Sequence, residues 1–264
     1  PSGETSTMPS PMASMMEAGV PCVPGSGGYP IVFYKLGTYL GTDQPVYSFQ
    51  PQGGDGRALP STTIEDMAKQ HLAEMKDMQP EGPYHLCGFS VGGLVAYEMA
   101  RRLHQTGEAV AFLGLLDTWL YRESWVSRWW QRLKDDIKYW RRRREALSYL
   151  RDDRIMPRAV RNSFPAKVHE RAARRYTPLP YPGDADLFAA VDIPDYSDAN
   201  VEAWASLIGG HLTVHEISAR HDLVKEPYVG DVARIITERL DEQSTGAPAP
   251  HEETNPQAPQ NPPG

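Results

Sequence analysis

The residues best suited to chemistry are Gly88-Phe89-Ser90-Val91-Gly92-Gly93, which contain a Gly-x-Ser-x-Gly pattern. An apolar run at 83–87 predicts a strand before it, and helix formers at 94–105 predict a helix after it. A serine at the tip of a strand–turn–helix is a candidate nucleophile. The glycines have a steric explanation. A Cβ at position 88 or 92 would collide with the neighbouring strand or helix, and position 93 lets the helix approach the sheet.

A serine hydroxyl needs an adjacent base to become a nucleophile. Of the eight histidines, His221 follows the last predicted strand, 212–217, and precedes the last predicted helix, about 227–240. It therefore shares the sheet edge of Ser90. The acid that orients this histidine has two candidates, Asp117 and Asp192, because each ends a predicted strand. The spacing of the residues leaves this choice open.

Acyl transfer also needs two backbone N–H groups that face the oxyanion. Val91 supplies one, since it follows the nucleophile at a helix N-terminus. The loop Pro24-Gly25-Ser26-Gly27-Gly28 follows an early predicted strand, 20–23, and we expect the Ser26 amide to be the second donor. This loop has no lysine and no GxxxxGK[ST] pattern, which argues against a phosphate-binding loop.

These residues must be positioned by an alternation of strands and helices. Strands are predicted at 20–23, 46–49, 83–87, 109–116, 186–191 and 212–217, and helices at 31–40, 64–78, 94–105, 203–208 and about 227–240. Thr62 and Glu65 have the spacing of a capping box for the second of these helices. The alternation predicts an α/β fold with a parallel doubly wound sheet, in which sites form at the carboxyl ends of strands.

Residues 119–178 interrupt this alternation. They hold five of the six tryptophans, and Trp125, Trp129, Leu133 and Ile137 recur every four residues, which predicts an amphipathic helix. We interpret the segment as a helical lid inserted after the strand that ends at Asp117. The stretch 119–176 contains 17 Lys and Arg against 7 Asp and Glu, whereas the remainder contains 10 against 27. A basic segment on an acidic body favours an acidic protein partner over nucleic acid.

The 264 residues suffice for one large domain, here expected at 19–240. Residues 1–18 resemble a flexible leader without the features of a secretion signal, and the initial proline suggests processing or a piece of a longer chain. Residues 241–264 have the composition of a disordered tail. Cys22 and Cys87 form no disulfide framework or zinc pattern and are expected to be buried thiols of a cytoplasmic protein. No apolar run reaches the length of a membrane span.

A set of ordered motifs carries a family resemblance over about residues 20–240. These are VPGSGG, MQPEGPYHL before GFSVGG, EMARRL, LLDTW and RHDLVKEPYVGDVARII. Together they resemble the chain-terminating thioesterase domains of nonribosomal peptide and polyketide synthases, which are members of the α/β-hydrolase superfamily. The sequence departs from the family at Pro21, where a longer apolar strand is usual, so we expect a short first strand.

The resemblance implies that Ser90 is the nucleophile, His221 the base and Asp117, rather than Asp192, the acid. It implies an α/β-hydrolase fold, a lid after the Asp117 strand, and no metal or organic cofactor. The substrate would be an acyl, polyketide or peptidyl chain on the phosphopantetheine of a carrier protein, released by hydrolysis or macrocyclisation. Such carriers are acidic, which agrees with a basic lid face. The alternatives are a carboxylesterase or lipase acting on oxygen esters and a non-catalytic carrier-docking module.

Overall fold

A six-stranded parallel sheet forms the centre of the molecule, with the strand order β2-β1-β3-β4-β5-β6. The strands are β1 Val20–Val23, β2 Val46–Ser48, β3 Tyr84–Phe89, β4 Val110–Leu116, β5 Ala185–Ala190 and β6 Leu212–Ile217. The computed structural model describes residues 19–120, 125–192 and 198–245, and only the backbone at 125–135 and 244–245. The predicted leader and the tail from residue 246 lie outside these ranges. All six predicted strands are present, and the predicted fold class is confirmed.

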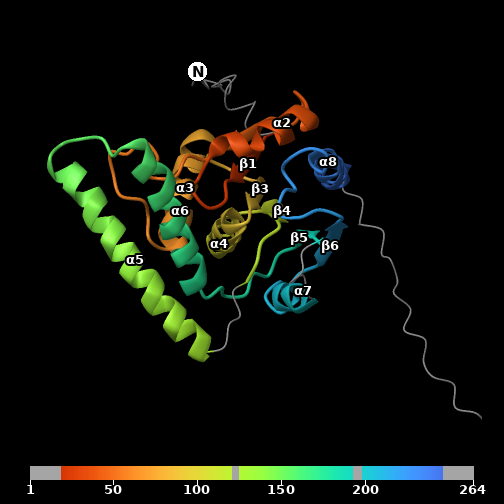
Figure 1. Cartoon of the computed structure of the whole chain (residues 1–264). Coiled ribbons are helices and arrows are strands. Elements are labelled where there is room, and N and C mark those ends of the chain that lie inside the picture. Colours follow the sequence, from red (N-terminus) through yellow and green to blue (C-terminus); the bar gives the residue numbers. More distant parts are fainter. Residues whose placement is uncertain (1–18, 121–124, 193–197, 246–264) are drawn as a thin grey trace, which may run out of the picture.

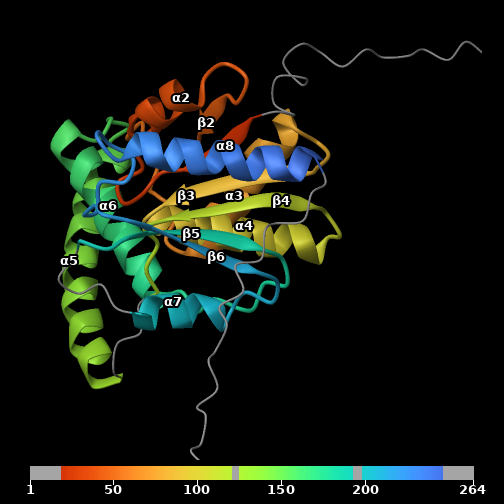
Figure 2. The same ribbon diagram turned by 90° about the vertical axis from the view of Figure 1, so that its right-hand side faces the viewer.

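Helices cover both faces of the sheet (Figures 1 and 2). They are η1 Pro30–Phe33, α2 Tyr34–Leu40, α3 Ile64–Met78, α4 Val91–Gln105, α5 Trp125–Arg151, α6 Arg158–Arg175, α7 Asp198–Ala205 and α8 Val229–Thr245. α2 and α8 pack on one face and α3 and α4 on the other, each with its own apolar core. Every residue of β5 is buried, as expected for a strand that is covered on both faces. None of the described helices is long and apolar enough to span a membrane.

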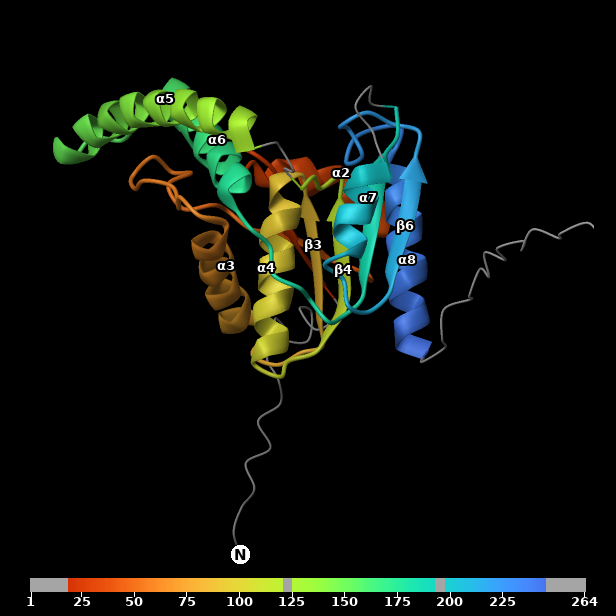
Figure 3. The ribbon, with the colours of Figure 1, turned by 90° about the horizontal axis from the view of Figure 1, so that it is seen from below.

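The strand order reverses between β1 and β3, which are neighbours although β2 lies between them in sequence. The chain leaves β1 towards α2 on one face and leaves β3 into α4 on the other face (Figure 3). Loops that diverge in this way open a crevice at the carboxyl ends of the two strands, where doubly wound folds place their sites. The two loops are Pro24–Gly28 and the turn at Ser90, so the topology brings together two segments that the sequence selects for catalysis.

The first strand has the four residues Val20–Val23, as Pro21 led us to expect. The Val20 amide donates to Pro45 O, and Cys22 O accepts from the Phe49 amide, so these two residues pair towards β2. The backbone groups of Pro21, which lies between them, point towards β3. Pairing of β1 with β3 starts only at Cys22. The missing N–H of Pro21 therefore falls where no ladder hydrogen bond is required.

Three details of the predicted elements are corrected. Thr63 rather than Thr62 caps α3, because its Oγ1 accepts from the Asp66 amide at 3.1 Å. α8 continues to Thr245, so the tail predicted from residue 241 begins inside a helix. Ile137, from the predicted apolar face of α5, is 63% exposed. Here the helix buries Tyr139 instead, and the side chains of Trp125, Trp129 and Leu133 lie outside the described residues.

α5 and α6 lie across the carboxyl ends of the strands at one side of the sheet (Figure 3). They share a small core of their own, made of Tyr139, Ala146, Met156, Val160, Phe164 and Val168. Asp136 on α5 accepts hydrogen bonds of 2.7 Å from Arg171 and Arg175 on α6. The two helices therefore form a coherent unit, and we call them the lid.

The lid is fixed to the body at its base and at its tip. At the base, the Tyr176 hydroxyl donates to Glu98 at 2.9 Å and the Tyr97 hydroxyl donates to Leu179 O at 2.7 Å. At the tip, the Met156 amide donates to Gly56 O at 3.1 Å. Both base contacts come from α4, so the lid is connected directly to the helix that follows Ser90.

A buried histidine lies between the lid and the body. His169 of α6 is 4% exposed, and in the described part of the chain its Nε2 has no hydrogen-bond partner. Burial, with a smaller electrostatic effect of His71 on α3, lowers the pKa of His169 to about 4. The imidazole is therefore neutral in the folded protein at pH values where it takes up a proton in the unfolded chain.

We expect His169→Met to reduce the loss of stability on acidification. As the pH falls from about 6.5 towards 4, the unfolded chain binds a proton at residue 169 before the folded protein does. The wild type thus loses about 3 kcal/mol of unfolding free energy from this residue, and the variant does not. Urea unfolding at pH 7.5 and pH 4.5 measures the difference, with the exposed His211→Met as the control. If the wild type and His169→Met lost the same unfolding free energy between pH 7.5 and pH 4.5, the prediction would be contradicted.

The start of α4 lies unusually close to the sheet. A Cβ on Gly88 would lie 2.3 Å from Gly92 O, and a Cβ on Gly92 would lie 2.1 Å from Val23 O. A Cβ on Gly93 would lie 1.8 Å from Thr118 Oγ1. The first two obstacles are backbone atoms, which cannot rotate away. The steric explanation inferred from the sequence for these three glycines is confirmed.

We expect Gly92→Ala to destabilise the fold by about 3 kcal/mol or more, because α4 would have to move away from β1. Gly37→Ala is the matched control. Gly37 also lies inside a helix, α2, but its Cβ would meet Val46 Cβ at an ordinary 3.4 Å. Since alanine is the better helix former, this control should gain about 0.5–1 kcal/mol. Urea denaturation of both variants tests the prediction, and similar midpoints would refute it.

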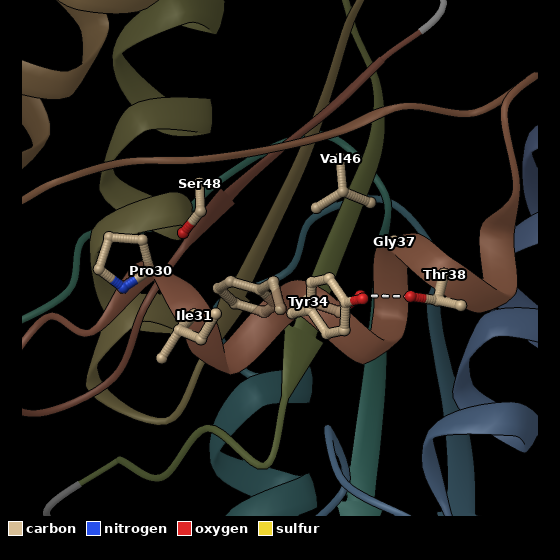
Figure 4. A pocket seen from close by; sticks show the side chains of 8 residues that line it. Pro30, Ile31, Tyr34, Gly37, Thr38, Val46 and Ser48 are labelled. Carbon is tan, nitrogen blue, oxygen red and sulfur yellow. Dashed lines mark hydrogen bonds between the residues drawn. The ribbon is translucent and has the colours of Figure 1, made fainter.

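An open apolar pocket of about 510 Å³ lies between η1, α2 and β2 (Figure 4). Ile31, Tyr34 and Val46 are among its lining residues, and Thr38 Oγ1 donates to Tyr34 O at its edge. None of the residues predicted for catalysis lines it. The candidate site described next is therefore separate from this pocket.

Candidate active site

Ser90 occupies the sharp turn between β3 and α4. Its backbone has φ 55° and ψ −123°, a left-handed conformation that a residue with a side chain rarely adopts. Backbone bonds hold it there, since the Ser90 amide donates to Leu116 O at 2.8 Å and Ser90 O accepts from the Gly93 amide at 3.0 Å. Such strain costs about 1–3 kcal/mol and persists only where the surroundings enforce it. The glycine contacts described above provide that enforcement.

Asp117 and His221 meet at the same edge of the sheet. Asp117 directly follows β4, and its Oδ2 is hydrogen-bonded to Nδ1 of His221. The Asp117 side chain is buried, whereas the imidazole is 52% exposed. A carboxylate at Nδ1 orients the ring and directs Nε2 away from itself, which is the arrangement of a general base with its acid.

The imidazole lies over the turn that carries Ser90. His221 stacks on Phe89, with ring centroids 4.8 Å apart and an angle of 26° between the rings. Phe89 directly precedes Ser90, so the stack places the histidine beside the serine turn. The loop that carries His221, between β6 and α8, is thereby placed against the end of β3.

The structure distinguishes the two candidate acids by geometry. Asp192 follows β5 and its amide donates to Ala219 O, but its side chain is exposed. Among the described residues, the carboxylate that bonds the His221 imidazole is that of Asp117. β4 is the neighbour of β3, whereas β5 is one strand further away, so the end of β4 is closer to Ser90.

The loop Pro24–Gly28 packs against the serine turn. A Cβ on Gly25 would lie 3.2 Å from Phe89 O and 3.3 Å from Ser90 Cβ. The Gly28 amide donates to Gly25 O at 2.9 Å and closes a turn around Ser26. Val91 is the first residue of α4, where a backbone N–H has no acceptor within the helix. Ser26 and Val91 thus lie on segments that flank Ser90.

The lid covers this loop. A Cβ on Gly27 would lie 3.7 Å from Ala166 Cβ of α6, and the Tyr29 hydroxyl donates to Asn162 O at 3.4 Å. α6 therefore passes directly above the segment that carries Ser26. α6 and the loop that carries Ser26 are therefore in direct contact.

Another histidine–carboxylate pair links two strands, and the sequence did not reveal it. His215 Nε2 is 2.8 Å from Asp186 Oδ1, inside the adjacent strands β6 and β5. Arg239 of α8 also bonds this carboxylate, at 2.9 Å. The pair lies within the strands instead of at their carboxyl ends, and an arginine neutralises it. We therefore assign the His215–Asp186 pair a structural role rather than a catalytic one.

Sequence reasoning also missed the residues around Asp117. The Trp119 indole N–H donates to Asp117 Oδ1 at 2.8 Å, and the Trp204 indole donates to Thr118 O at 2.9 Å. Asn200 contacts the same loop. Trp119 could have been found from its position two residues after the acid, but nothing in the sequence indicates the distant Asn200 or Trp204.

Comparison with known proteins agrees with this fold. The family model for the thioesterase domain matches residues 19–240. The solved structure of RedJ, a thioesterase of the prodiginine pathway in Streptomyces coelicolor, superposes with a TM-score of 0.66 at 21% identity, covering 86% of this chain and 92% of that one. The NocB thioesterase domain in covalent complex with a fluorophosphonate nocardicin G analogue gives 0.62 at 21% identity, covering 86% and 96%. At this identity the two structures establish the fold.

Sequence relatives are large synthetases. Vanchrobactin synthetase VabF of Vibrio anguillarum is 32% identical over 216 residues, which cover 78% of this chain and 7% of the relative. A dimodular nonribosomal peptide synthase of Bacillus subtilis is 27% identical over 248 residues, covering 84% and 10%. The chain thus spans a tenth or less of the length of these relatives. With the family model matched over 19–240, the chain belongs to the thioesterase domain family, and the resemblance predicted from its motifs is confirmed.

Proposed function

We propose that this domain releases an acyl, polyketide or peptidyl chain from the phosphopantetheine arm of a carrier protein. The supporting observation is the His221–Asp117 pair, with the imidazole stacked on Phe89 next to Ser90, in a member of the thioesterase family. Ser90 is the nucleophile, His221 the base and Asp117 the acid. The phosphopantetheine belongs to the carrier, and the proposed chemistry requires no metal or organic cofactor.

The first half of the reaction forms an ester. Nε2 of His221 takes the proton of the Ser90 hydroxyl as Oγ attacks the thioester carbonyl. The tetrahedral oxyanion accepts hydrogen bonds from the Val91 and Ser26 amides, which are fixed in place before the charge develops. Collapse breaks the C–S bond, the imidazolium returns its proton to the departing thiolate, and acyl-Ser90 remains.

The second half of the reaction removes the chain. His221 deprotonates either water or a hydroxyl or amine within the acyl chain, and that nucleophile attacks the ester carbonyl. The same amides stabilise the second oxyanion, and the Ser90 oxygen leaves with the proton from His221. Water gives a free acid, and an internal nucleophile gives a lactone or a lactam.

The exposed face of α5 is suited to the carrier. Lys138, Arg141 and Arg144 are exposed on it, whereas carrier proteins of this class are acidic. Opposite surface charges accelerate encounter and orient the partner. We propose that this basic lid face receives the carrier. We further propose a cytoplasmic location, which the two free buried thiols, Cys22 and Cys87, support.

We expect brief incubation with a medium-chain acyl N-acetylcysteamine thioester to add one acyl mass to the wild type and none to Ser90→Ala. Removal of the nucleophile should lower thiol release by at least about 10³-fold. Intact-protein mass spectrometry and a thiol assay measure both, with Ser163→Ala on the exposed side of α6 as the control. Unchanged turnover in Ser90→Ala would exclude the mechanism, and a folded wild type without adduct or thiol release would favour a docking module.

The same assay separates the thioesterase from an oxygen-ester hydrolase. The matching oxygen ester is offered at equal concentration, and we expect the thioester to have the higher kcat/KM. A strong preference for the oxygen ester would instead support a carboxylesterase or lipase.

We expect the double variant Arg141→Glu and Arg144→Glu to raise KM for an acyl chain on a holo carrier protein about tenfold at low salt, with kcat unchanged. KM for the small thioester should not change, because that substrate has no acidic protein surface to pair with the exposed arginines. Steady-state kinetics at two salt concentrations measure the effect. Lys35→Glu with Arg234→Glu, on α2 and α8, is the control of equal charge change. An identical KM in both double variants would exclude the basic lid face as the carrier site.

A further inference from the structure

We infer that Trp119 is a positioning residue for Asp117 and that Asn200 holds Trp119 in place. This inference rests on the proposed function, since it assigns roles around the proposed acid. The Trp119 indole donates to Asp117 Oδ1 at 2.8 Å, and the other carboxylate oxygen, Oδ2, bonds His221. With both oxygens engaged, the carboxylate has one orientation relative to the imidazole.

Asn200 is hydrogen-bonded to the backbone on both sides of Trp119. Its Oδ1 accepts from the Leu120 amide at 3.0 Å, and its Nδ2 donates to Thr118 O at 3.1 Å. The side-chain amide thus satisfies one donor and one acceptor of the loop, as a neighbouring strand would. Asn200 lies in the first turns of α7, 80 residues away in sequence, so the fold must bring it here.

Two further contacts fix the same loop. The buried Trp204 indole donates to Thr118 O at 2.9 Å, and Thr118 Oγ1 donates to Leu116 O at 3.3 Å. Thr118 also occupies the space left by the missing side chain of Gly93. The loop is therefore held by α7 on one side and by the first turn of α4 on the other.

The type of donor is as important as its position. The described residues include three buried carboxylates, Glu98, Asp117 and Asp186. Arginines bond Glu98 and Asp186, whereas Asp117 is bonded by an indole and an imidazole. A neutral N–H orients the carboxylate without cancelling its charge, which remains available to stabilise the imidazolium formed during acylation.

The hydrogen bond is tested first without substrate. In the full chain labelled with ¹⁵N-tryptophan, Trp119→Phe identifies the Trp119 indole resonance by its loss. We expect Asp117→Ala to shift this resonance, because the charged acceptor is removed, and Asp192→Ala to leave it in place. A Trp119 indole resonance that does not respond to Asp117→Ala would overturn the inference.

The positioning role is tested by kinetics and by the His221 Nδ1–H resonance. With the small thioester, we expect Trp119→Phe to lower kcat about tenfold with little change in KM, because the ring remains and only the N–H is lost. The downfield proton of the His221–Asp117 bond should shift in the same variant. Asn200→Asp, which keeps the acceptor for the Leu120 amide and loses the donor to Thr118 O, should have a smaller effect in the same direction.

Trp140→Phe on the exposed side of α5 is the matched control, and thermal melting checks that each variant is folded. Wild-type kcat and an unchanged His221 Nδ1–H resonance in folded Trp119→Phe would overturn the positioning role. If the wild type releases no thiol, the proposed function fails, but the resonances still decide whether Trp119 orients the Asp117–His221 pair.

Discussion

The close approach of α4 to the sheet is the constraint on which the rest of the structure depends. Because residues 88, 92 and 93 have no side chains, the helix begins in contact with β1 and with the loop after β4. Only a very tight turn can connect β3 to a helix so near, and Ser90 therefore takes φ 55°. The same contact unites the ends of three strands, since Val23, Ser90 and Thr118 all border it. The contact of α4 with β1 and with the loop after β4 therefore holds together a site whose residues come from separate strands.

Burial of charge is the second constraint. A buried carboxylate is costly unless it is hydrogen-bonded or paired. Glu98 meets this requirement with Arg101, Arg102 and Tyr176, and its pKa is lowered: burial raises it, but these hydrogen bonds outweigh the burial. Through Tyr176 this network also joins the base of the lid to α4. Asp117 uses neutral donors instead, which suits a group that must respond to a charge appearing on its neighbour.

The lid behaves as a separate unit placed on this frame. It has its own core and its own Asp136–Arg171 and Asp136–Arg175 pairs, and it contacts the body at its base, at its tip and along α6. The neutral His169, on the buried side of α6, makes this arrangement sensitive to pH.

The parallel sheet, the serine turn and the position of Ser90, Asp117 and His221 at one sheet edge could be predicted from the amino-acid sequence alone. These follow from local causes, because apolar runs, glycine spacing and strand–helix alternation act over a few residues. The sequence could not choose the register of the α3 cap, since Thr62 with Glu65 and Thr63 with Asp66 have equal spacing. It also could not decide whether Ile137 is buried, because helical period does not say which face finds a partner.

Which carboxylate bonds His221 depends on how the strands assemble. Asp117 and Asp192 both end strands, and the family resemblance favoured Asp117, but the hydrogen bond depends on the strand order that places β4 beside β3. The role of Asn200 likewise depends on α7 returning to Leu120, 80 residues earlier in the chain. The physical reason is common to both. Hydrogen bonds between distant residues form only after the sheet has fixed the geometry, and no local pattern encodes them.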